Sequence, residues 1–331
     1  MDDGSVSKRW LRRSRLVARE YAFMERRDGC FSPATSTHVM NLLPMVYLQR
    51  CAERRGCENH AAEHVLATVD IKDAFLCVPQ AKPFAVTLAG RKYIIAKKRP
   101  GQRLGAKAWY WFFRDFLSKT FGYEWCTEQP CLCRNEHSAL MLHVDDVLFV
   151  GKRKFWEEQF LPKLKEQFSV SASVLEGEGS SISFLKRKLV KVDHGLALAP
   201  GTNIDKLVEN FESYFGQVRA QHVACDSSIQ LPDVSSNLTS RDAYAYRSAV
   251  GGLLYLARDR PDLLFCVKEL SAKMAQPTVT ALQRLKKVMG YVKGTSSYAV
   301  VIAEPEGGQG KWENTNESFW VLESASDSDW S

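Results

Sequence analysis

The sequence predicts an α+β fold in which an antiparallel sheet, backed by helices, is followed by a mostly helical half. Two hairpin patterns in the first half, at 83–97 and 138–150, predict antiparallel strands. Amphipathic patterns between 203 and 293 predict that helices dominate the second half. With 331 residues, the chain can form two structural units of ~100–200 residues each.

The elements of the first half follow from the period of their apolar residues. Crowded or amphipathic apolar side chains predict helices at 38–54, 106–121 and 153–168. Short β-prone runs predict a strand at 64–70, a hairpin at 83–97 that turns at Gly90, and a hairpin at 138–150. The strand at 64–70 ends on an acid, and the second hairpin has two adjacent acids at its tip.

The second half begins after a Gly/Ser/Glu loop at 173–181, which we expect to be a subdomain boundary. From 182 to 300 the patterns are mostly helical, and the predicted helices lie at 203–215, 242–257, 261–275 and 279–293. A polar Ser/Pro/Asp/Asn linker occupies 225–240. A separate segment, 317–331, ends the chain.

Composition indicates an intracellular protein with a polyanionic partner. The net charge is +7 and the isoelectric point is about 8.9, which favours binding to nucleic acid. No run of about 18 apolar residues predicts a membrane span, and the N-terminus lacks the apolar core of a secretory signal. Nine cysteines without a disulfide-scaffold spacing suit a reducing, cytoplasmic or nuclear location.

Three aspartates are the candidate chemical centre. Asp70 directly follows an apolar strand, and Asp145 and Asp146 lie at the tip of a hairpin. Adjacent carboxylates repel each other unless a cation compensates, and oxygen ligands suit Mg²⁺ or Mn²⁺. Three such groups could hold two metals for phosphoryl transfer. On these residues alone, solvated turn acids are the alternative, and exposed acids are the more common case.

The sequence segments around these acids resemble the metal-binding motifs of reverse transcriptases of the copia-type retrotransposon branch. Those motifs are Val69-Asp-Ile-Lys-Asp-Ala-Phe75 and Leu142-His-Val-Asp-Asp-Val-Leu148. Further matches in the expected order are Arg15-Leu-Val-Ala-Arg19, Phe31-Ser-Pro-Ala34, Gly105-Ala-Lys-Ala-Trp-Tyr110, Tyr246-Arg-Ser-Ala-Val-Gly-Gly-Leu-Leu-Tyr255, Arg260-Pro-Asp262, Tyr291-Val-Lys-Gly-Thr295 and Ser326-Asp-Ser-Asp-Trp330.

The resemblance implies a right-hand polymerase with an antiparallel-sheet palm, fingers, a helical thumb and a connection-like region. Fingers and palm would span 1–185, thumb and connection-like helices 186–300, and the start of a ribonuclease H domain 301–331. It implies an RNA-directed DNA polymerase that uses an RNA or DNA template with its primer, and dNTPs. The runner-up is a decayed or domesticated copy that binds nucleic acid without polymerising.

Roles for single residues are carried over from the same resemblance. Asp70, Asp145 and Asp146 would hold two Mg²⁺ or Mn²⁺ ions per active site, and the backbone carbonyl of Ile71 would add a ligand. Phe75 falls where the family places an aromatic that clashes with a ribose 2′-hydroxyl; the alternative is a core aromatic.

The incoming dNTP would meet a second group of residues. Arg13, Arg15 and Arg19 are candidates for its triphosphate, because Arg makes bidentate phosphate contacts; a plain solvated basic face is the alternative for each. Gln102 lies in the loop that the family uses to line the substrate, although its spacing differs from the family glutamine.

The sequence departs from the family pattern at three points. His143 replaces the tyrosine that precedes Val-Asp-Asp, next to the primer, and Glu20 replaces a glycine. Asp327 matches the first metal ligand of a ribonuclease H domain, but the chain stops a few residues later. We therefore expect no ribonuclease H activity.

Other patterns are weaker. His60-Ala-Ala-Glu-His64 has the spacing of an inverted zinc peptidase motif, which arises readily by chance. Cys126, Cys131, Cys133 and His137 lack the paired spacing of common zinc sites. The aromatic run from Trp109 to Phe113 could stack on bases, but its helical spacing favours the core.

Overall fold

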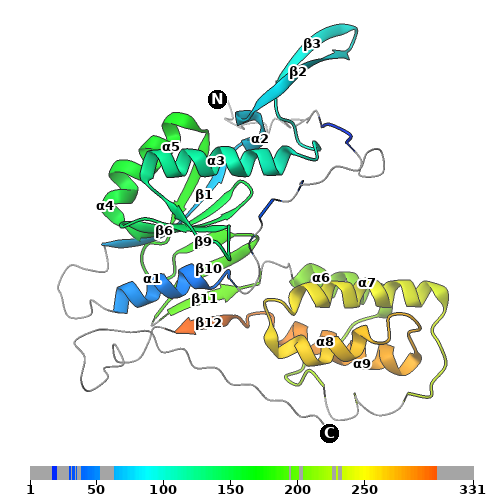
Figure 1. Cartoon of the computed structure of the whole chain (residues 1–331). Coiled ribbons are helices and arrows are strands. Elements are labelled where there is room, and N and C mark those ends of the chain that lie inside the picture. The colour runs from blue at the N-terminus through cyan, green and yellow to red at the C-terminus, as the bar shows by residue number, and fades with distance from the viewer. Residues whose placement is uncertain are drawn as a thin grey trace, which may run out of the picture.

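The computed structural model describes residues 17–20, 30, 32–33, 35, 39–52, 63–193, 195–200, 204–225, 229 and 233–303. Within them, a six-stranded sheet, a four-stranded sheet, a separate hairpin and a group of helices make up the fold (Figure 1). The predicted α+β class is confirmed. No helix in these ranges is both long and apolar enough to cross a membrane.

The six-stranded sheet carries the candidate acids. Its strands lie in the order β4-β5-β6-β7-β1-β8, and every neighbouring pair is antiparallel. The bounds are β1 His64–Ile71, β4 Glu124–Trp125, β5 Leu132–Arg134, β6 Ser138–His143, β7 Asp146–Lys152 and β8 Val170–Val174. The strand predicted at 64–70 and the hairpin predicted at 138–150 are confirmed.

Each face of this sheet has its own cover, because alternate residues of a strand point to opposite faces. Val65, Ala67 and Val69 of β1 belong to the core shared with the helices behind the sheet, whereas Leu66 belongs to the core on the other face. The helices behind are α3 (Gly105–Phe121), α4 (Arg153–Phe155), a π-helical turn (Trp156–Phe160) and α5 (Leu161–Gln167). The other face packs on α1 (Leu42–Ala52) and the four-stranded sheet.

The aromatic run in α3 is mostly core. Trp109, Tyr110 and Phe113 are buried, whereas the Trp111 side chain is 52% exposed. Trp109 stacks on Phe113 and meets the edge of Phe168, which follows α5. The core interpretation of this run is confirmed for the three buried rings.

The four-stranded sheet was not predicted, because the region from 182 was expected to be mostly helical. Its order is β12-β11-β10-β9, from β9 (Ser181–Phe184), β10 (Arg187–Val192), β11 (Gly195–Ala199) and β12 (Val300–Ala303). The predicted loop at 173–181 is wrong at both ends, since 173–174 belong to β8 and 181 to β9. These strands are short. β9, β10 and β11 pair with their neighbours in the chain, and β12 joins β11 from about 100 residues later.

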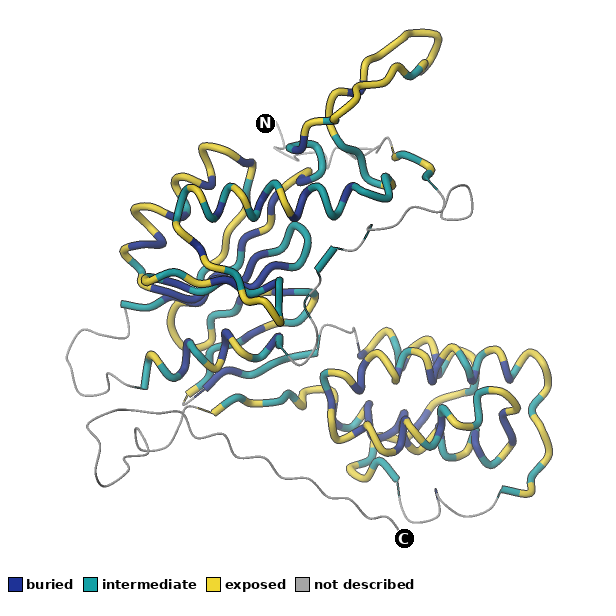
Figure 2. Tube along the Cα trace, in the orientation of Figure 1, coloured by how far each residue is buried: buried dark blue, intermediate teal, exposed yellow. Residues whose placement is uncertain are grey.

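A hairpin stands out from the body of the protein. β2 (Pro79–Leu88) and β3 (Arg91–Lys97) follow the short helix α2 (Ala74–Cys77), and their turn contains Gly90 at φ 76°. The predicted hairpin at 83–97 is confirmed. Figure 2 shows that most of its described residues are exposed. The basic and apolar side chains there include Lys92, Tyr93 and Ile94.

The helical unit confirms the four predicted helices. It consists of α6 (Ile204–Phe215), α7 (Ser240–Leu256), a 3-10 turn (Pro261–Leu263) with α8 (Leu264–Ser271), and α9 (Val279–Gly294). Their apolar stripes form one core around Tyr246, Leu253 and Leu285, each 0% exposed. The N-terminus of α7 is capped by Thr239, whose hydroxyl accepts from the Asp242 N–H at 3.2 Å.

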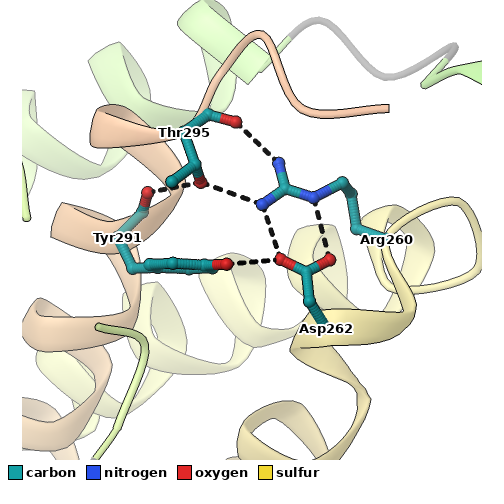
Figure 3. Close-up of polar contacts among 4 residues, drawn as sticks. All are labelled: Arg260, Asp262, Tyr291 and Thr295. Carbon is teal, nitrogen blue, oxygen red and sulfur yellow. Dashed lines mark hydrogen bonds and ion pairs between the residues drawn. The ribbon is translucent and has the colours of Figure 1, made fainter. Parts of the chain in front are cut away.

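A buried charge ties two ends of this unit together (Figure 3). Arg260, 1% exposed, donates to both carboxylate oxygens of Asp262 at 2.9 and 2.7 Å, and to the Thr295 carbonyl and hydroxyl at 2.9 and 2.8 Å. The Tyr291 hydroxyl donates to the same carboxylate at 2.7 Å. The Arg-Pro-Asp motif before α8 is therefore fixed to the C-terminal end of α9.

Candidate active site

A row of polar side chains crosses four strands of the six-stranded sheet. His143 of β6 pairs with Asp146 of β7, Asp146 pairs with Asp70 of β1, and Asp70 pairs with Ser171 of β8. Directly opposed residues of an antiparallel pair share a face, with Cβ atoms about 4.5–5.5 Å apart. The Ser171 hydroxyl donates to the Asp70 carboxylate at 3.3 Å. The strand register therefore brings two of the predicted acids side by side.

Asp145 joins this row through the turn between β6 and β7. The turn consists of Val144 and Asp145, and Val144 has φ 58°. Positive φ at the first position is what tight hairpins require, but glycine normally supplies it. A β-branched residue there is a conformational outlier that costs about 1–3 kcal/mol. The sequence thus places strain directly beside the candidate acids.

Two hydrogen bonds hold the backbone of this turn. The indole N–H of Trp109 donates to the Val144 carbonyl at 2.6 Å, and the Ile71 N–H donates to the Asp145 carbonyl at 3.0 Å. The second bond places Asp145 at the end of β1, next to Asp70. All three predicted acids therefore lie at one corner of the sheet, although 75 residues separate Asp70 from Asp145.

The electrostatics of this corner are unbalanced. Burial, then the charge of Asp145 and then that of Asp70, raise the pKa of Asp146 to about 6. Every one of these causes disfavours the charged form, so the three carboxylates are close enough to repel one another. A divalent cation would remove this penalty, and carboxylate oxygens are the ligands that Mg²⁺ and Mn²⁺ prefer.

The donor set suits such a cation, but it is not preassembled. In the part of the chain that the structure describes, no three His, Cys, Asp or Glu side chains form a ready metal-binding group. The backbone brings Asp70, Asp145 and Asp146 together, and side-chain rotation would have to complete the site. The N–H of Ile71 bonds to the turn, and the role of its carbonyl stays a prediction.

His143 lies at the end of the row and is half-buried. Burial lowers the pKa of His143, while the charge of Asp145 raises it by a smaller amount. Its Nδ1 atom is buried, and no hydrogen-bond partner reaches it from the described residues. His143 and Asp146 are cross-strand partners and line the same pocket.

Only some of the residues predicted to contact the dNTP lie in the part of the chain that the structure describes. Phe75 is half-buried, and a Cβ atom built on Gly105 would lie 3.3 Å from its ring, so it packs at the start of α3. The side-chain carbonyl of Gln102 accepts the Arg99 N–H at 2.9 Å and closes its own loop. Arg19 is exposed. Arg13, Arg15 and Asp327 lie outside the described residues.

The short segment 17–20 lies against the loop that contains Gln102. The Ala18 N–H donates to the Pro100 carbonyl at 2.9 Å, and Glu20 accepts the Arg103 N–H at 3.1 Å. A Cβ atom on Gly101 (φ 87°) would lie 2.1 Å from the Ala18 carbonyl oxygen, so this close approach requires glycine. Arg19 and Gln102 are therefore neighbours in the fold.

A pocket of about 400 Å³ opens beside the aspartate row. His143 and Asp146 line one side, and residues from the turn between β9 and β10 and from the end of α7 line the other. Those opposing residues include Lys186, Arg187, Tyr255, Arg258 and Asp259. Arg187 and Asp259 form an ion pair that joins the four-stranded sheet to the helical unit. The pocket thus has an acidic wall and a largely basic wall.

Sequence reasoning missed Ser171, Lys186 and Arg258. Each lies in an element of ordinary composition, and no local pattern marks it. Only the register of β8 on β1 brings Ser171 to Asp70, and only the packing of α7 near the second sheet brings Arg258 to the pocket.

An exposed face of α7 continues from this pocket. Tyr244, Leu254 and Tyr255 are 74%, 43% and 44% exposed, and Gly251 lies between them on the same side. A Cβ atom on Gly251 would meet nothing within 4 Å, whereas one on Gly252 would lie 2.5 Å from a Leu207 methyl group. Packing explains Gly252 but not Gly251, although glycine inside a helix costs about 0.5–1 kcal/mol.

Comparison with known proteins gives a consistent set of relatives, although no family model matches the chain. The chain is 26% identical over 318 residues to the retrovirus-related Pol polyprotein from transposon RE1 of Arabidopsis thaliana, covering 91% of the chain and 20% of the polyprotein. It is 25% identical over 253 residues to the Pol polyprotein from transposon TNT 1-94 of Nicotiana tabacum, covering 69% and 18%. Transposon RE2 of Arabidopsis thaliana gives 28% over 206 residues. The chain spans a fifth or less of each polyprotein.

Solved structures give more distant similarity. A foamy viral protease-reverse transcriptase in complex with an RNA/DNA hybrid has a TM-score of 0.40 at 15% identity, covering 71% of this chain and 27% of that one. Telomerase from Candida albicans in complex with a fragment of telomeric RNA has a TM-score of 0.36 at 12% identity, covering 81% and 52%.

Proposed function

From its similarity, over most of its length, to the Pol polyproteins of copia-type retrotransposons, we propose that this chain is the polymerase region of a reverse transcriptase. The observation that carries the proposal is the pairing of Asp70 with Asp146 beside the turn that holds Asp145. The reaction is nucleotidyl transfer from a dNTP to a primer 3′-hydroxyl, directed by an RNA or DNA template. We propose a cytoplasmic or nuclear site for this reaction, which suits nine cysteines without a disulfide-scaffold spacing.

The parts of the fold take the following roles in this proposal. Residues 1–185 form the fingers and palm, with the six-stranded sheet as the palm and the β2–β3 hairpin in the fingers. Residues 186–300 form the thumb and a connection-like region, and 301–331 begin a ribonuclease H domain. These boundaries are assigned from the family resemblance. Within 186–300, the ion pair of Arg187 with Asp259 joins the four-stranded sheet to the helical unit.

The chemistry centres on the aspartate corner. Two divalent cations, Mg²⁺ or Mn²⁺, would supply Lewis acidity at the primer 3′-hydroxyl and offset charge on the pyrophosphate leaving group. Asp70, Asp145 and Asp146 would hold them, with the Ile71 carbonyl as a further ligand. Ser171 orients the Asp70 carboxylate through its hydrogen bond. The strand register fixes the backbone positions of Asp70 and Asp146 before substrate arrives, which lowers the entropic cost of reaction.

The surroundings of the corner suit a nucleic-acid duplex. Lys186 and Arg258 face the acid row across the pocket and would contact phosphates of the primer end. The exposed face of α7, with Tyr255 and Gly251, would lie along the duplex, where a residue without a side chain permits close approach. The net charge of +7 supports the same partner.

The incoming dNTP would enter between the hairpin and the palm. Arg19 and Gln102 lie on adjoining segments of the chain, and with Arg13 and Arg15 they would bind the triphosphate. Phe75 would exclude a ribose 2′-hydroxyl. His143, in place of a tyrosine, would contact the primer end with a smaller ring.

The test is primer extension by the purified chain on an RNA template, with and without Mg²⁺. Wild-type protein should extend the primer only with the metal, and Asp145→Asn should abolish extension while fluorescence anisotropy shows unchanged primer–template binding. Asp115→Asn is the matched control, because Asp115 lies on the exposed side of α3, paired with Lys119.

Two results would change the proposal. Wild-type protein that binds the duplex but never extends a primer would be the decayed or domesticated copy considered above. Parallel loss of binding and extension in Asp145→Asn would make Asp145 a structural residue.

A further inference from the structure

The turn that carries Asp145 is held from behind by a side chain of α3. Trp109 donates its indole N–H to the Val144 carbonyl at 2.6 Å. Trp109 belongs to the core on the helix-covered face of the sheet, whereas Asp146, Asp70 and His143 share the other face with the pocket. The contact therefore reaches the catalytic corner from the side opposite to substrate.

Trp109 is placed rigidly enough to act as a fixed donor. Its side chain is 1% exposed, it stacks on Phe113 with ring centroids 5.0 Å apart, and it meets the edge of Phe168 at 5.8 Å. Large rings packed in this way keep a single orientation. The indole N–H consequently points at one position, which is the carbonyl of the turn.

The turn needs such a partner because its backbone is strained. Val144 has φ 58°, in the left-handed region that a β-branched side chain avoids. Strained backbone persists only where its surroundings hold it in place. Here Trp109 holds the Val144 carbonyl, and the Ile71 N–H holds the Asp145 carbonyl at 3.0 Å. The two bonds fix consecutive peptide groups, from which Asp145 and Asp146 project.

We propose that Trp109 is a positioning residue, which locks the Val144–Asp145 turn so that Asp145 and Asp146 face Asp70. It acts through the backbone of the turn and touches no reacting atom. The inference rests on the proposed polymerase function for its effect on turnover. Its effect on the turn itself does not depend on that function.

The test compares Trp109→Phe with Trp156→Phe in the full chain. Both changes keep an aromatic ring and remove an indole from the same core, where Trp156 is 2% exposed and packs on Phe149 at 4.8 Å. Only Trp109 donates to the turn. Urea unfolding of both variants measures the general loss of packing and serves as the reference.

Primer extension supplies the first readout. Trp109→Phe should lower kcat by about 10- to 100-fold with little change in KM for dNTP, because a displaced catalytic group reduces turnover more than binding. Trp156→Phe should leave kcat near the wild-type value. Equal kcat losses in the two variants, in proportion to lost stability, would overturn the positioning role while leaving the proposed function in place.

Hydrogen exchange supplies the second readout and needs no activity. Amides of residues 143–147 should exchange faster in Trp109→Phe than in wild type or Trp156→Phe. Unchanged exchange in Trp109→Phe would overturn the inference, even if wild-type protein extends no primer and the proposed function fails. Val144→Gly relieves the strain and should reduce both effects of Trp109→Phe in the double variant. The Val144→Gly background also tests the inference if Trp109→Phe alone folds poorly. If Trp109→Phe changes kcat and amide exchange as much in that background as in wild type, the inference is contradicted.

Discussion

In the helical unit, the buried guanidinium of Arg260 is matched by Asp262 and Thr295, whereas at the corner of the six-stranded sheet Asp70, Asp145 and Asp146 face one another. The first cluster satisfies its charge within the chain, and its hydrogen bonds join the start of α8 to the end of α9. In the second cluster the pKa of Asp146 is raised, and the turn at Val144 has a strained backbone.

The difference between these two clusters separates a charge arrangement that stabilises the fold from one that lowers stability at the candidate site. A buried ion pair that is fully hydrogen-bonded needs nothing from outside the chain. Like charges held together, beside a backbone outlier, lower stability and persist where a ligand compensates them. We therefore propose a cation at the aspartate corner, whereas the Arg260 cluster holds the start of α8 against the end of α9.

The largest expected effect is on the paired cluster. Asp262→Ala should lower the free energy of unfolding by about 3–5 kcal/mol, because it leaves the Arg260 guanidinium buried without a counter-charge. Denaturant unfolding at neutral pH measures the loss. In the double variant Arg260→Met/Asp262→Leu the loss should be smaller, and an equal loss in both would mean that packing, rather than the unpaired charge, decides it.

The same cluster should weaken in acid. Burial tends to raise the pKa of Asp262, but hydrogen bonds from Arg260 and Tyr291 lower it overall. The ionised Asp262 carboxylate therefore contributes to the free energy of unfolding above its unfolded pKa of about 3.9. This contribution is lost as the pH falls below that value. In Asp262→Ala this part of the acid dependence should disappear.

The sugar-selection role of Phe75 comes next in size. Phe75→Ala should raise incorporation of rNTPs relative to dNTPs by about tenfold, because the ring no longer meets a 2′-hydroxyl. Single-nucleotide extension measures the ratio. Phe112→Ala is the control, since Phe112 also packs partly buried against the same core, and its selectivity should not change. Unchanged selectivity in Phe75→Ala would make Phe75 a packing residue at Gly105.

At the aspartate corner, removal of a carboxylate should raise the free energy of unfolding, whereas Asp262→Ala lowers it. The raised pKa of Asp146, about 6, means that folding is favoured while this group is protonated, below pH 3.8, and disfavoured as the pH rises through 6. Without divalent metals at pH 7.5, Asp146→Asn should therefore raise the free energy of unfolding, by up to about 1 kcal/mol after solvent screening. At pH 4 the gain should vanish. A loss of stability at pH 7.5 would mean that the charge of Asp146 is compensated within the chain.

The smallest effect concerns Gly251. Gly251→Ala should raise the free energy of unfolding by about 0.5–1 kcal/mol, because nothing within 4 Å opposes a methyl group there. It should also weaken duplex binding, measured by anisotropy. Gly252→Ala is the matched control and should not stabilise, because the methyl group would meet Leu207. Full duplex affinity in Gly251→Ala would remove this face of α7 from the interface.

Much of the six-stranded sheet was predictable because its signals are local. The apolar, β-prone run that ends on Asp70, and the two apolar runs flanking Asp145 and Asp146, predicted three strands and the position of the acids. The helices at 203–293 followed from their apolar stripes. Assignment of these acids to metal binding came from the family resemblance rather than from spacing.

The remainder depends on contacts between distant segments. Ser171 reaches Asp70 only through the register of β8. β12 pairs with β11 to complete the second sheet, although the whole helical unit lies between these two strands in the sequence. The Trp109 indole bonds to a turn 35 residues later, and no sequence pattern marks that bond. Helical spacing identified Trp109 as a core residue but could not show which carbonyl its N–H meets.

The most direct test of the central claim counts the Mn²⁺ ions that the aspartate corner binds. Electron paramagnetic resonance of the wild-type chain, saturated with a dideoxy-terminated primer–template and the next dNTP, should show two bound Mn²⁺ per chain. Asp70→Asn/Asp145→Asn should lose this binding while retaining the duplex. The same Mn²⁺ count in wild type and in the double variant would contradict the assignment of the three aspartates as metal ligands.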